Sequence, residues 1–268
     1  MNKTERLMRD ILDRGRSDFG VVSVKAEFEA EGTRMDELLR LVDIARSADL
    51  ELTVKIGGCE AVRDLLEAKQ IGVKYIVAPM VESPYALSKY VLAKNLVFQP
   101  DEQEDTDFLF NVETISAFEK IAALVQIASK DHELAGIVFG RVDFSGSLGI
   151  GREGIDQERV TQHILKVAEL CDENSLDLVL GGGISIDSLP VVKRVAERKL
   201  DRFETRKVVF DANALENSDL ERGLLNAVHF ELLWLTNKRE YYGRISLEDE
   251  KRIGMLESRW KLLNTQIL

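Results

Sequence analysis

The stretch GIVFGRVDFSGSLG, residues 136–149, joins a short apolar run to two charged residues and a glycine-rich turn. An apolar run of this length, bounded by glycine, is typical of a buried strand. Arg141 and Asp143 come directly after it, where a strand of a parallel β/α fold would end. Because the carboxyl ends of such strands surround the binding site of a β/α barrel, the two charges indicate a place where a polar ligand binds.

Similar apolar runs recur along the chain and alternate with helical patterns. They cover residues 19–29, 52–58, 74–80, 107–113, 136–143, 176–183 and 207–213, with a weaker run at 95–99. Between them, MDELLRLVDIARSA (35–48) and ISAFEKIAALVQIA (115–128) have apolar residues at helical spacing. This alternation, with no linker-like segment to divide it, predicts an α/β fold, a (β/α)8 barrel of the TIM type.

The C-terminal part of the chain departs from this rhythm. LERGLLNAVHFELLWL (220–235) and LEDEKRIGMLESRWKLL (247–263) have the amphipathic pattern of two extra helices. We expect a single domain over residues 1–268, with the barrel at about 15–215 and a helical extension at about 216–268. The first extra helix carries an apolar stripe that needs its own barrel or a neighbouring subunit as a partner, and we expect a homo-oligomer; the stripe is Leu220, Leu224, Val228, Leu232 and Leu235.

Composition excludes several classes of protein. The chain has 268 residues, with 36 basic and 47 acidic side chains and a net charge of −11. Nucleic acids and anionic membranes need a basic face, so we expect neither as a partner. Cys59 and Cys171 lack the paired spacing of a disulfide framework or a zinc site. The charged N-terminus has no signal-peptide pattern and no apolar segment approaches membrane-spanning length, so we expect a cytoplasmic protein.

Side-chain alternation along the strands gathers polar residues on one face. The polar set is Ser23, Lys25, Glu27 and Glu29, then Thr53 and Lys55, then Asn111 and Glu113, and finally Arg141 and Asp143. In the last strand, Phe139 shares the face of Arg141 and Asp143, opposite Val138 and Val142. For any single position, the start of a solvated loop is an equally good interpretation. As a set, the residues predict one polar pocket. Its two acids on adjacent strands, Glu113 and Asp143, are hard oxygen ligands suited to Mg²⁺ or Mn²⁺.

A glycine-rich string and an asparagine-containing string lie at the ends of the last two predicted strands. We expect LGGGIS (180–185) and FDAN (210–213) at the ends of the seventh and eighth strands. Barrels often bind phosphate there through backbone amides. A tight turn before a helix is the simpler interpretation of the glycine triplet.

Three strings occur in order at intervals of roughly thirty residues: PMVES (79–83), FNVET (110–114) and GRVDFSGSLG (140–149). They resemble the HpcH/HpaI aldolase and citrate lyase family of barrels, over about residues 50–215. The resemblance implies that Glu113 and Asp143 hold a divalent metal, Mg²⁺ or Mn²⁺. It also implies that Asn111 and the main-chain amides at Gly140, Arg141 and Val142 hold the carboxylate of a keto acid.

The sequence departs from the family pattern at three points. The family's arginine on the strand before PMVES corresponds to Lys55, and its proline after the first glycine of the third string corresponds to Arg141, which suggests an additional anionic group on the ligand. The aldolase branch also has a histidine on an early strand. Here the histidines fall in segments that we interpret as helical; they are His132, His163 and His229.

The predicted function is that of a metal-dependent carbon–carbon lyase or aldolase acting on a 2-keto acid. Lys55 would stabilise the enolate, and Lys25 or Glu27 would move the proton. Two alternatives stay open. A lysine on a barrel strand can form a Schiff base, which would make Lys25 or Lys55 the centre of a metal-free aldolase. A non-catalytic ligand-binding barrel would also be compatible with the altered residues.

Overall fold

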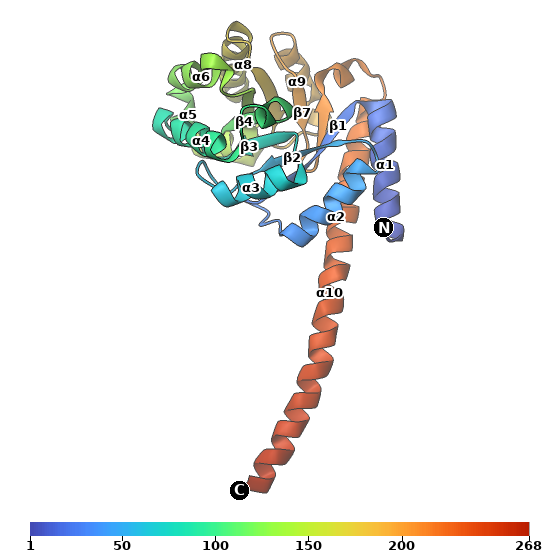
Figure 1. Ribbon diagram of the computed structural model, residues 1–268. Helices are drawn as coiled ribbons and strands as arrows, with labels where there is room; N and C mark the ends of the chain where they lie inside the picture. Colours follow the sequence, from blue (N-terminus) through green and yellow to red (C-terminus); the bar gives the residue numbers. More distant parts are fainter. Residues whose placement is uncertain (268) are drawn as a thin grey trace.

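Eight strands close into a barrel in the order in which they occur along the chain (Figure 1). This closed barrel confirms the predicted α/β barrel fold. The computed structural model describes residues 1–267. Its strands are β1 (Val21–Glu27), β2 (Glu51–Lys55), β3 (Tyr75–Ala78), β4 (Asp107–Val112), β5 (Gly136–Gly140), β6 (Asp177–Gly181), β7 (Arg202–Glu204) and β8 (Val208–Asp211).

Helices surround this barrel, beginning with α1 (Lys3–Phe19), which precedes the first strand. The helix predicted over 115–128 is divided into two. The helices after α1 are α2 (Met35–Arg46), α3 (Val62–Ile71), α4 (Pro84–Val97), α5 (Ile115–Phe118), α6 (Ile121–Ser129), α7 (Arg141–Ser147), α8 (Glu158–Glu173), α9 (Leu189–Ala196) and α10 (Leu220–Ile267). Short 3-10 turns lie at η1 (Glu102–Asp105), η2 (Lys130–His132), η3 (Arg152–Gly154), η4 (Ile186–Ser188) and η5 (Ala212–Glu216).

The last strand runs against its neighbours, unlike the parallel strands before it. β8 is antiparallel to both β7 and β1. Only residues 205–207 join β7 to β8, whereas a parallel crossover needs about a dozen residues or more. FDAN (210–213) therefore lies at the opposite end of the barrel from the one expected, where Asp211 donates its backbone N–H to the carbonyl of Gly20. LGGGIS (180–185) follows β6, not the seventh strand.

Two strand predictions were wrong for reasons of length and context. β7 contains only three residues, too few for an alternating pattern to be visible. The weak run at 95–99 overlaps the last residues of α4 and forms no strand. A short apolar run cannot be assigned to strand or helix by periodicity alone.

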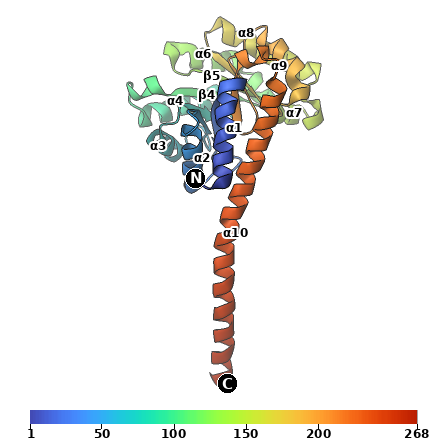
Figure 2. The same ribbon diagram turned by 90° about the vertical axis from the view of Figure 1, so that its right-hand side faces the viewer.

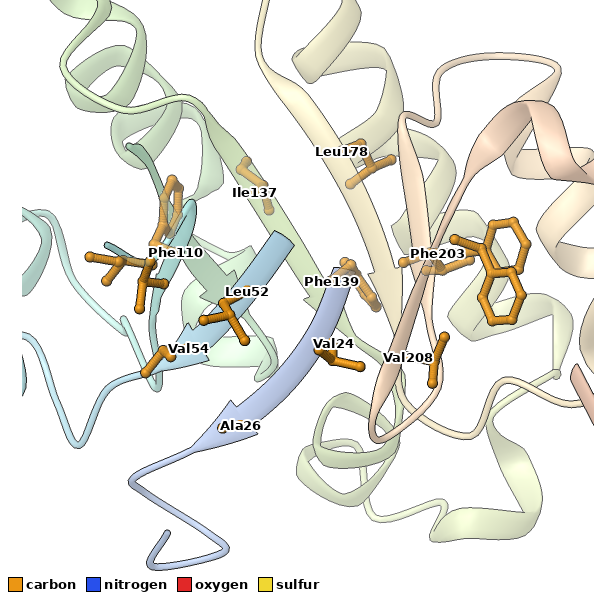
Figure 3. Packing of buried hydrophobic residues seen from close by; sticks show 14 of the residues in the cluster. Val24, Ala26, Leu52, Val54, Phe110, Ile137, Phe139, Leu178, Phe203 and Val208 are labelled. Atoms are coloured by element: carbon orange, nitrogen blue, oxygen red, sulfur yellow. The ribbon is translucent and has the colours of Figure 1, made fainter. Parts of the chain in front are cut away.

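Apolar side chains pack on both sides of the barrel wall. The larger cluster includes strand residues such as Val24, Leu52 and Phe110 (Figure 3). Residues of the surrounding helices complete it. A small inner cluster is formed by Val77, Leu109, Val138 and Val179. Along each strand, polar residues alternate with the apolar residues of the larger cluster and therefore point into the barrel. They lie beyond the small inner cluster, at the carboxyl ends of the strands.

The predicted alternation at the end of β5 was wrong. Val138 lies in the inner cluster and Phe139 in the outer one, the reverse of the expected faces. The strand ends at Gly140, and α7 begins at Arg141. Because a helix rotates successive side chains by about 100° rather than 180°, Arg141 and Asp143 do not share a strand face.

The C-terminal extension is one helix of 48 residues rather than two. Its first part packs against α1, and the rest projects away from the barrel (Figures 1 and 2). Leu220 and Leu224 are buried, but Val228, Leu232 and Leu235 of the predicted stripe are exposed. The buried face continues instead through Ala227, Phe230 and Trp234. In the described range, no helix combines the length and apolar character needed to cross a membrane.

Candidate active site

A cavity of about 690 Å³ opens at the carboxyl ends of the parallel strands. Most of the polar residues singled out in the sequence lie in its wall, although they come from separate strands and loops. These are Lys25, Glu27, Glu29, Lys55, Asn111, Glu113 and Asp143. Gly140 and Val142, expected to act through their main-chain amides, line the cavity as well. A cavity of this size is within the range for small-molecule sites.

Lys25 is a buried lysine held between two carboxylates. Its Nζ lies 2.5 Å from Glu204 Oε1 and 3.2 Å from Glu27 Oε1. Burial disfavours the ammonium, but the charges of Glu204 and Glu27 outweigh it and raise the pKa of Lys25. In Glu27, burial is likewise outweighed by Lys25 and Lys55, so its carboxyl pKa is lowered. Lys25 is therefore an ammonium and Glu27 a carboxylate at neutral pH.

Lys55 makes a second set of ion pairs beside the first. Its Nζ lies 3.1 Å from Glu29 Oε2 and 3.3 Å from Glu113 Oε2. Burial opposes the charged form, yet Glu113 and Glu29 raise the pKa of Lys55 above its ordinary value. Lys55 is thus a fixed positive charge next to the carboxylate that the sequence assigned to a metal.

Glu113 is fixed from several sides at the end of β4. Its Oε1 accepts the backbone N–H of Met80 at 2.8 Å, and its Oε2 accepts Asn111 Nδ2 at 2.7 Å. Gly140 allows this packing, since a Cβ there would lie 2.9 Å from Glu113 Cβ. The strings PMVES and FNVET therefore contribute to one arrangement, in which the first holds the carboxylate supplied by the second.

Asp143 differs from Glu113 in being uncommitted. It lies in the first turn of α7, is exposed, and lines the cavity. Its side chain makes no hydrogen bond or ion pair with any residue in the described range 1–267. Asp143 is consequently free to bind a ligand or cation entering from solvent.

Arg141 lies behind the cavity wall rather than in it. Its side chain is fully buried, with Nη1 2.6 Å from Asp156 Oδ1 and Nε donating to the carbonyl of Gly182 at 3.0 Å. Burial lowers the pKa of Arg141, and Asp156 offsets part of this effect. The guanidinium therefore joins α7 to the loop after β6. The expected contact between Arg141 and a ligand anion has no support in this geometry.

The cavity contains charged residues that the sequence patterns did not reveal. Glu204 comes from the short strand β7, and Arg206 from the β7–β8 turn that follows it. Arg152 and Glu231 also line the cavity. Their only sequence signal is charge near an element end, which is too common to be selective. None of the three histidines, all in the described part of the chain, is a cavity residue.

The residues available for a metal are few but suitable. Within residues 1–267, no group of three or more His, Cys, Asp and Glu side chains forms a ready metal cluster. Mg²⁺ is often held by only one or two carboxylates and otherwise by water and substrate. The cavity lining has six carboxylates and four cationic side chains. Glu113, the uncommitted Asp143 and the surplus of negative charge therefore fit a divalent cation.

A closed β/α barrel with a lysine- and carboxylate-lined cavity at the carboxyl ends of its strands has the architecture of a barrel enzyme. The sequence model of one protein family, HpcH/HpaI aldolase/citrate lyase, matches residues 23–183. The chain belongs to this family, as the three sequence strings indicated. The matched range contains Lys25 to Gly183 but not Glu204 or Arg206.

Solved structures with the same fold include two members of the family. An HpcH/HpaI aldolase from Desulfitobacterium hafniense DCB-2 is 17% identical, with a TM-score of 0.59 over 78% of this chain and 84% of that chain. A family protein from Burkholderia cenocepacia J2315 is 12% identical, with a TM-score of 0.55 over 74% and 92%. A variant of the citrate synthase SbnG is 17% identical, with a TM-score of 0.55 over 87% and 90%. No curated protein matches the chain.

Proposed function

We propose that this chain is a carbon–carbon lyase or aldolase that acts on a 2-keto acid with a divalent metal, Mg²⁺ or Mn²⁺. One observation carries the proposal: Glu113 and Asp143, from different β/α units, line the same cavity. The excess of carboxylates over cations in that cavity supports a bound cation. Held by Glu113 and Asp143, the metal would supply a Lewis acid for the keto oxygen of the substrate.

The substrate carboxylate would lie against the start of α7. Gly182 has a φ of +84°, and a Cβ at this position would lie 2.7 Å from the backbone nitrogen of Arg141 and 2.8 Å from that of Val142. Any side chain would cover these two amides, so glycine keeps them accessible. Gly140, Arg141 and Val142 would thus bind the carboxylate through the main chain, while the Arg141 side chain holds α7 in position.

The lysines and Glu27 would have different tasks in the reaction. Lys55 places a positive charge beside Glu113, where negative charge would develop on the substrate oxygen. Lys25 remains protonated because of Glu204 and Glu27, so it is unsuited to accept a proton. Glu27 is ionised and is therefore the better candidate for the base. Lys25 would orient it through their ion pair.

The ion pairs argue against a Schiff-base mechanism. A lysine must lose its proton before its nitrogen can attack a ketone. Neighbouring carboxylates raise the pKa of both Lys25 and Lys55, and each is held in ion pairs. Borohydride in the presence of pyruvate should therefore leave both lysines unmodified.

Exchange of the pyruvate methyl protons in D2O, followed by NMR, tests the proposal without knowledge of the second substrate. We expect exchange with Mg²⁺ or Mn²⁺, its loss in chelator, and its recovery on adding metal. Glu113→Gln and Asp143→Asn should each slow exchange by roughly 100-fold or more. Glu231→Gln, which removes a rim carboxylate of the same cavity, is the matched control and should retain activity. Binding of metal and pyruvate without exchange would favour the non-catalytic barrel.

We also propose that the protein is a homo-oligomer joined through α10. Two exposed apolar groups share one heptad register on this helix: Leu225, Val228, Leu232 and Leu235, and then Ile253, Leu256, Trp260 and Leu263. The second group lies on the part that projects from the barrel (Figure 2). Apolar residues at alternating spacings of three and four form the seam of a coiled coil.

The charges beside this seam favour a second copy in parallel orientation. If Ile253 and Leu256 occupy the a and d positions, Arg252 is at g and Glu257 at e. A parallel pair brings g of one helix to the following e of the other, so Arg252 would face Glu257 of the partner subunit. An antiparallel pair would instead bring like charges together.

A further inference from the structure

The two polar atoms of the Asn111 side chain have different surroundings. Asn111 is 4% exposed and lines the cavity at the end of β4. Its Nδ2 donates to Glu113 Oε2 at 2.7 Å. Its Oδ1 is buried and accepts no hydrogen bond from any residue in the described range 1–267. A buried acceptor without a partner is destabilising, so its presence in a cavity wall indicates a ligand that satisfies it.

Glu113 fixes which way the Asn111 amide is turned. An ionised carboxylate can only accept hydrogen bonds, so it requires the NH2 group of the amide and not its oxygen. Glu113 also accepts from the backbone N–H of Met80 and lies 3.3 Å from the Lys55 ammonium, contacts that suit an acceptor. Asn111 lies on β4 and Glu113 directly follows this strand, two residues further on, and both line the cavity. Oδ1 is therefore the Asn111 atom left with no partner in the described range, while Nδ2 already has one.

We infer that Asn111 Oδ1 is a third oxygen ligand of the divalent cation, beside Glu113 and Asp143. The inference rests on the metal dependence proposed above. A carboxylate has about four lone-pair sites, and Met80, Asn111 and Lys55 use three of those of Glu113. Glu113 thus retains limited capacity for a cation. A neutral amide oxygen is a hard ligand of the kind that Mg²⁺ and Mn²⁺ accept, and it adds no further negative charge.

This role differs from the one that the sequence resemblance implied. A residue that holds the substrate carboxylate must present a hydrogen-bond donor. One of the two N–H groups of the Asn111 amide is bound to Glu113, whereas Oδ1 has no partner in the described range, and this oxygen would repel a carboxylate. Asn111 is therefore better suited to bind the cation than the anionic end of the keto acid.

Two substitutions separate the oxygen of Asn111 from its NH2 group. Asn111→Ala removes both, whereas Asn111→Asp keeps an oxygen and removes the donor to Glu113. Mn²⁺ binding to the full-length chain is measured by the EPR signal of the free ion, without substrate. We expect Asn111→Ala to weaken Mn²⁺ binding by at least about tenfold, as for loss of a direct or supporting ligand. Asn111→Asp should bind Mn²⁺ as tightly as the wild type or more tightly.

A count of metal-bound water gives a second readout. Tb³⁺ luminescence lifetimes in H2O and D2O report the number of coordinated waters, and Asn111→Ala should gain one. Asn111→Ser, which is also too short to reach the cation, provides the same comparison if the alanine variant does not fold. Circular dichroism checks the fold of each variant.

The outcomes distinguish this inference from the proposed function. If Glu113→Gln weakens Mn²⁺ binding but Asn111→Ala and Asn111→Asp weaken it equally, only the donor to Glu113 matters and the inference is wrong. Unchanged Mn²⁺ affinity in Asn111→Ala, with weaker oxalate binding, would make Asn111 a substrate contact and would also overturn it. A wild-type chain that binds no Mn²⁺ would overturn the proposed metal dependence together with the inference.

Discussion

Met80 donates its backbone N–H to Glu113 Oε1 at 2.8 Å from a left-handed backbone conformation with φ of +49°. Such a conformation costs a residue with a Cβ about 1–3 kcal/mol and persists where the surrounding structure requires it. Here it directs an amide at Glu113, the carboxylate that we propose as a metal ligand. The second residue of PMVES therefore acts through its main chain, and its neighbour Glu82 instead accepts a hydrogen bond from Thr114 Oγ1.

The first prediction follows from this conformation. Met80 is 46% exposed, so replacing it removes little packing. Met80→Gly should leave the free energy of unfolding unchanged or raise it by about 1 kcal/mol, because glycine adopts positive φ without strain. Met80→Val should lower it by about 1–2 kcal/mol, because a β-branched residue is poorly tolerated there. Urea unfolding measures both, and equal destabilisation by the two variants would show that packing dominates over backbone strain.

Strand alternation predicted the inner residues of β1, β2 and β4 correctly, because these strands continue to the point where their polar residues enter the cavity. It failed at β5, where the backbone becomes helical at Arg141. The sequence places Arg141 and Asp143 two residues apart, but only the start of α7 determines that one is buried and the other exposed. Strand length, rather than residue type, limited the prediction.

The second prediction concerns the buried ion pairs of Lys25. Lys25→Met keeps nearly the length of the side chain but removes the ion-pair partner of Glu204 and the cation nearest to Glu27, whose other partner, Arg206, lies 4.0 Å away. Breaking a buried pair by removing one partner should lower the free energy of unfolding by about 3–5 kcal/mol at pH 7. Asp143→Asn, which breaks no ion pair, is the control and should be close to the wild type in stability.

The loss of stability caused by Lys25→Met should depend on pH in a defined direction. In the wild type the pKa of Glu27 is lowered, so its stabilising contribution is present above pH 4.5 and is lost as the pH falls through the folded-state pKa. In Lys25→Met, Lys55 and Arg206 remain near Glu27, but loss of the nearest cation should raise the pKa of Glu27 from its wild-type value, and the buried carboxylates should destabilise the fold as the pH rises. Urea unfolding at pH 4 and pH 7 should therefore show the larger difference from the wild type at pH 7. A difference independent of pH would indicate lost packing alone.

The third prediction concerns the two thiols. Burial raises the pKa of Cys171 to about 12, with Asp201 adding to the effect. Cys59 is only partly buried, and burial raises its pKa less far. Because the thiolate is the reactive form, a thiol reagent at pH 8 should modify Cys59 slowly in the native protein and leave Cys171 unmodified until unfolding. Mass spectrometry of the alkylated peptides distinguishes the two sites, and early labelling of Cys171 would contradict this assignment.

The ion pairs explain why half of the site was not predictable from the sequence. Lys25 and Glu204 are 179 residues apart, and Glu204 lies on a strand too short to recognise. Nothing local to RFE distinguishes it from a loop. Only closure of the barrel through the antiparallel strand β8 brings β7 and β1 close enough for their inward residues to meet across it.

The last prediction tests the proposed pairing of α10 with a second copy. Replacing Leu256 and Trp260 by lysine would put charges into the apolar seam, and the sedimentation mass should fall to that of a monomer. Leu256 is 50% and Trp260 64% exposed in the single chain, so the fold should survive the change. Leu92→Lys, at an exposed apolar residue on α4, is the matched control and should not alter the mass.

Charge reversal then reports the orientation of the two helices. In a parallel pair, Arg252→Glu alone sets like charges against Glu257 of the partner subunit and should weaken dimerisation, by about 0.3–0.5 kcal/mol for each of the two symmetric contacts. The double variant Arg252→Glu, Glu257→Arg restores opposite charges and should recover the wild-type dissociation constant. In an antiparallel pair g faces g and e faces e, so Arg252→Glu would only exchange one like-charge contact for another and the double variant would recover nothing. Sedimentation equilibrium at low salt distinguishes these patterns, and a wild-type chain that is monomeric at all concentrations would leave α10 without a second copy as its partner.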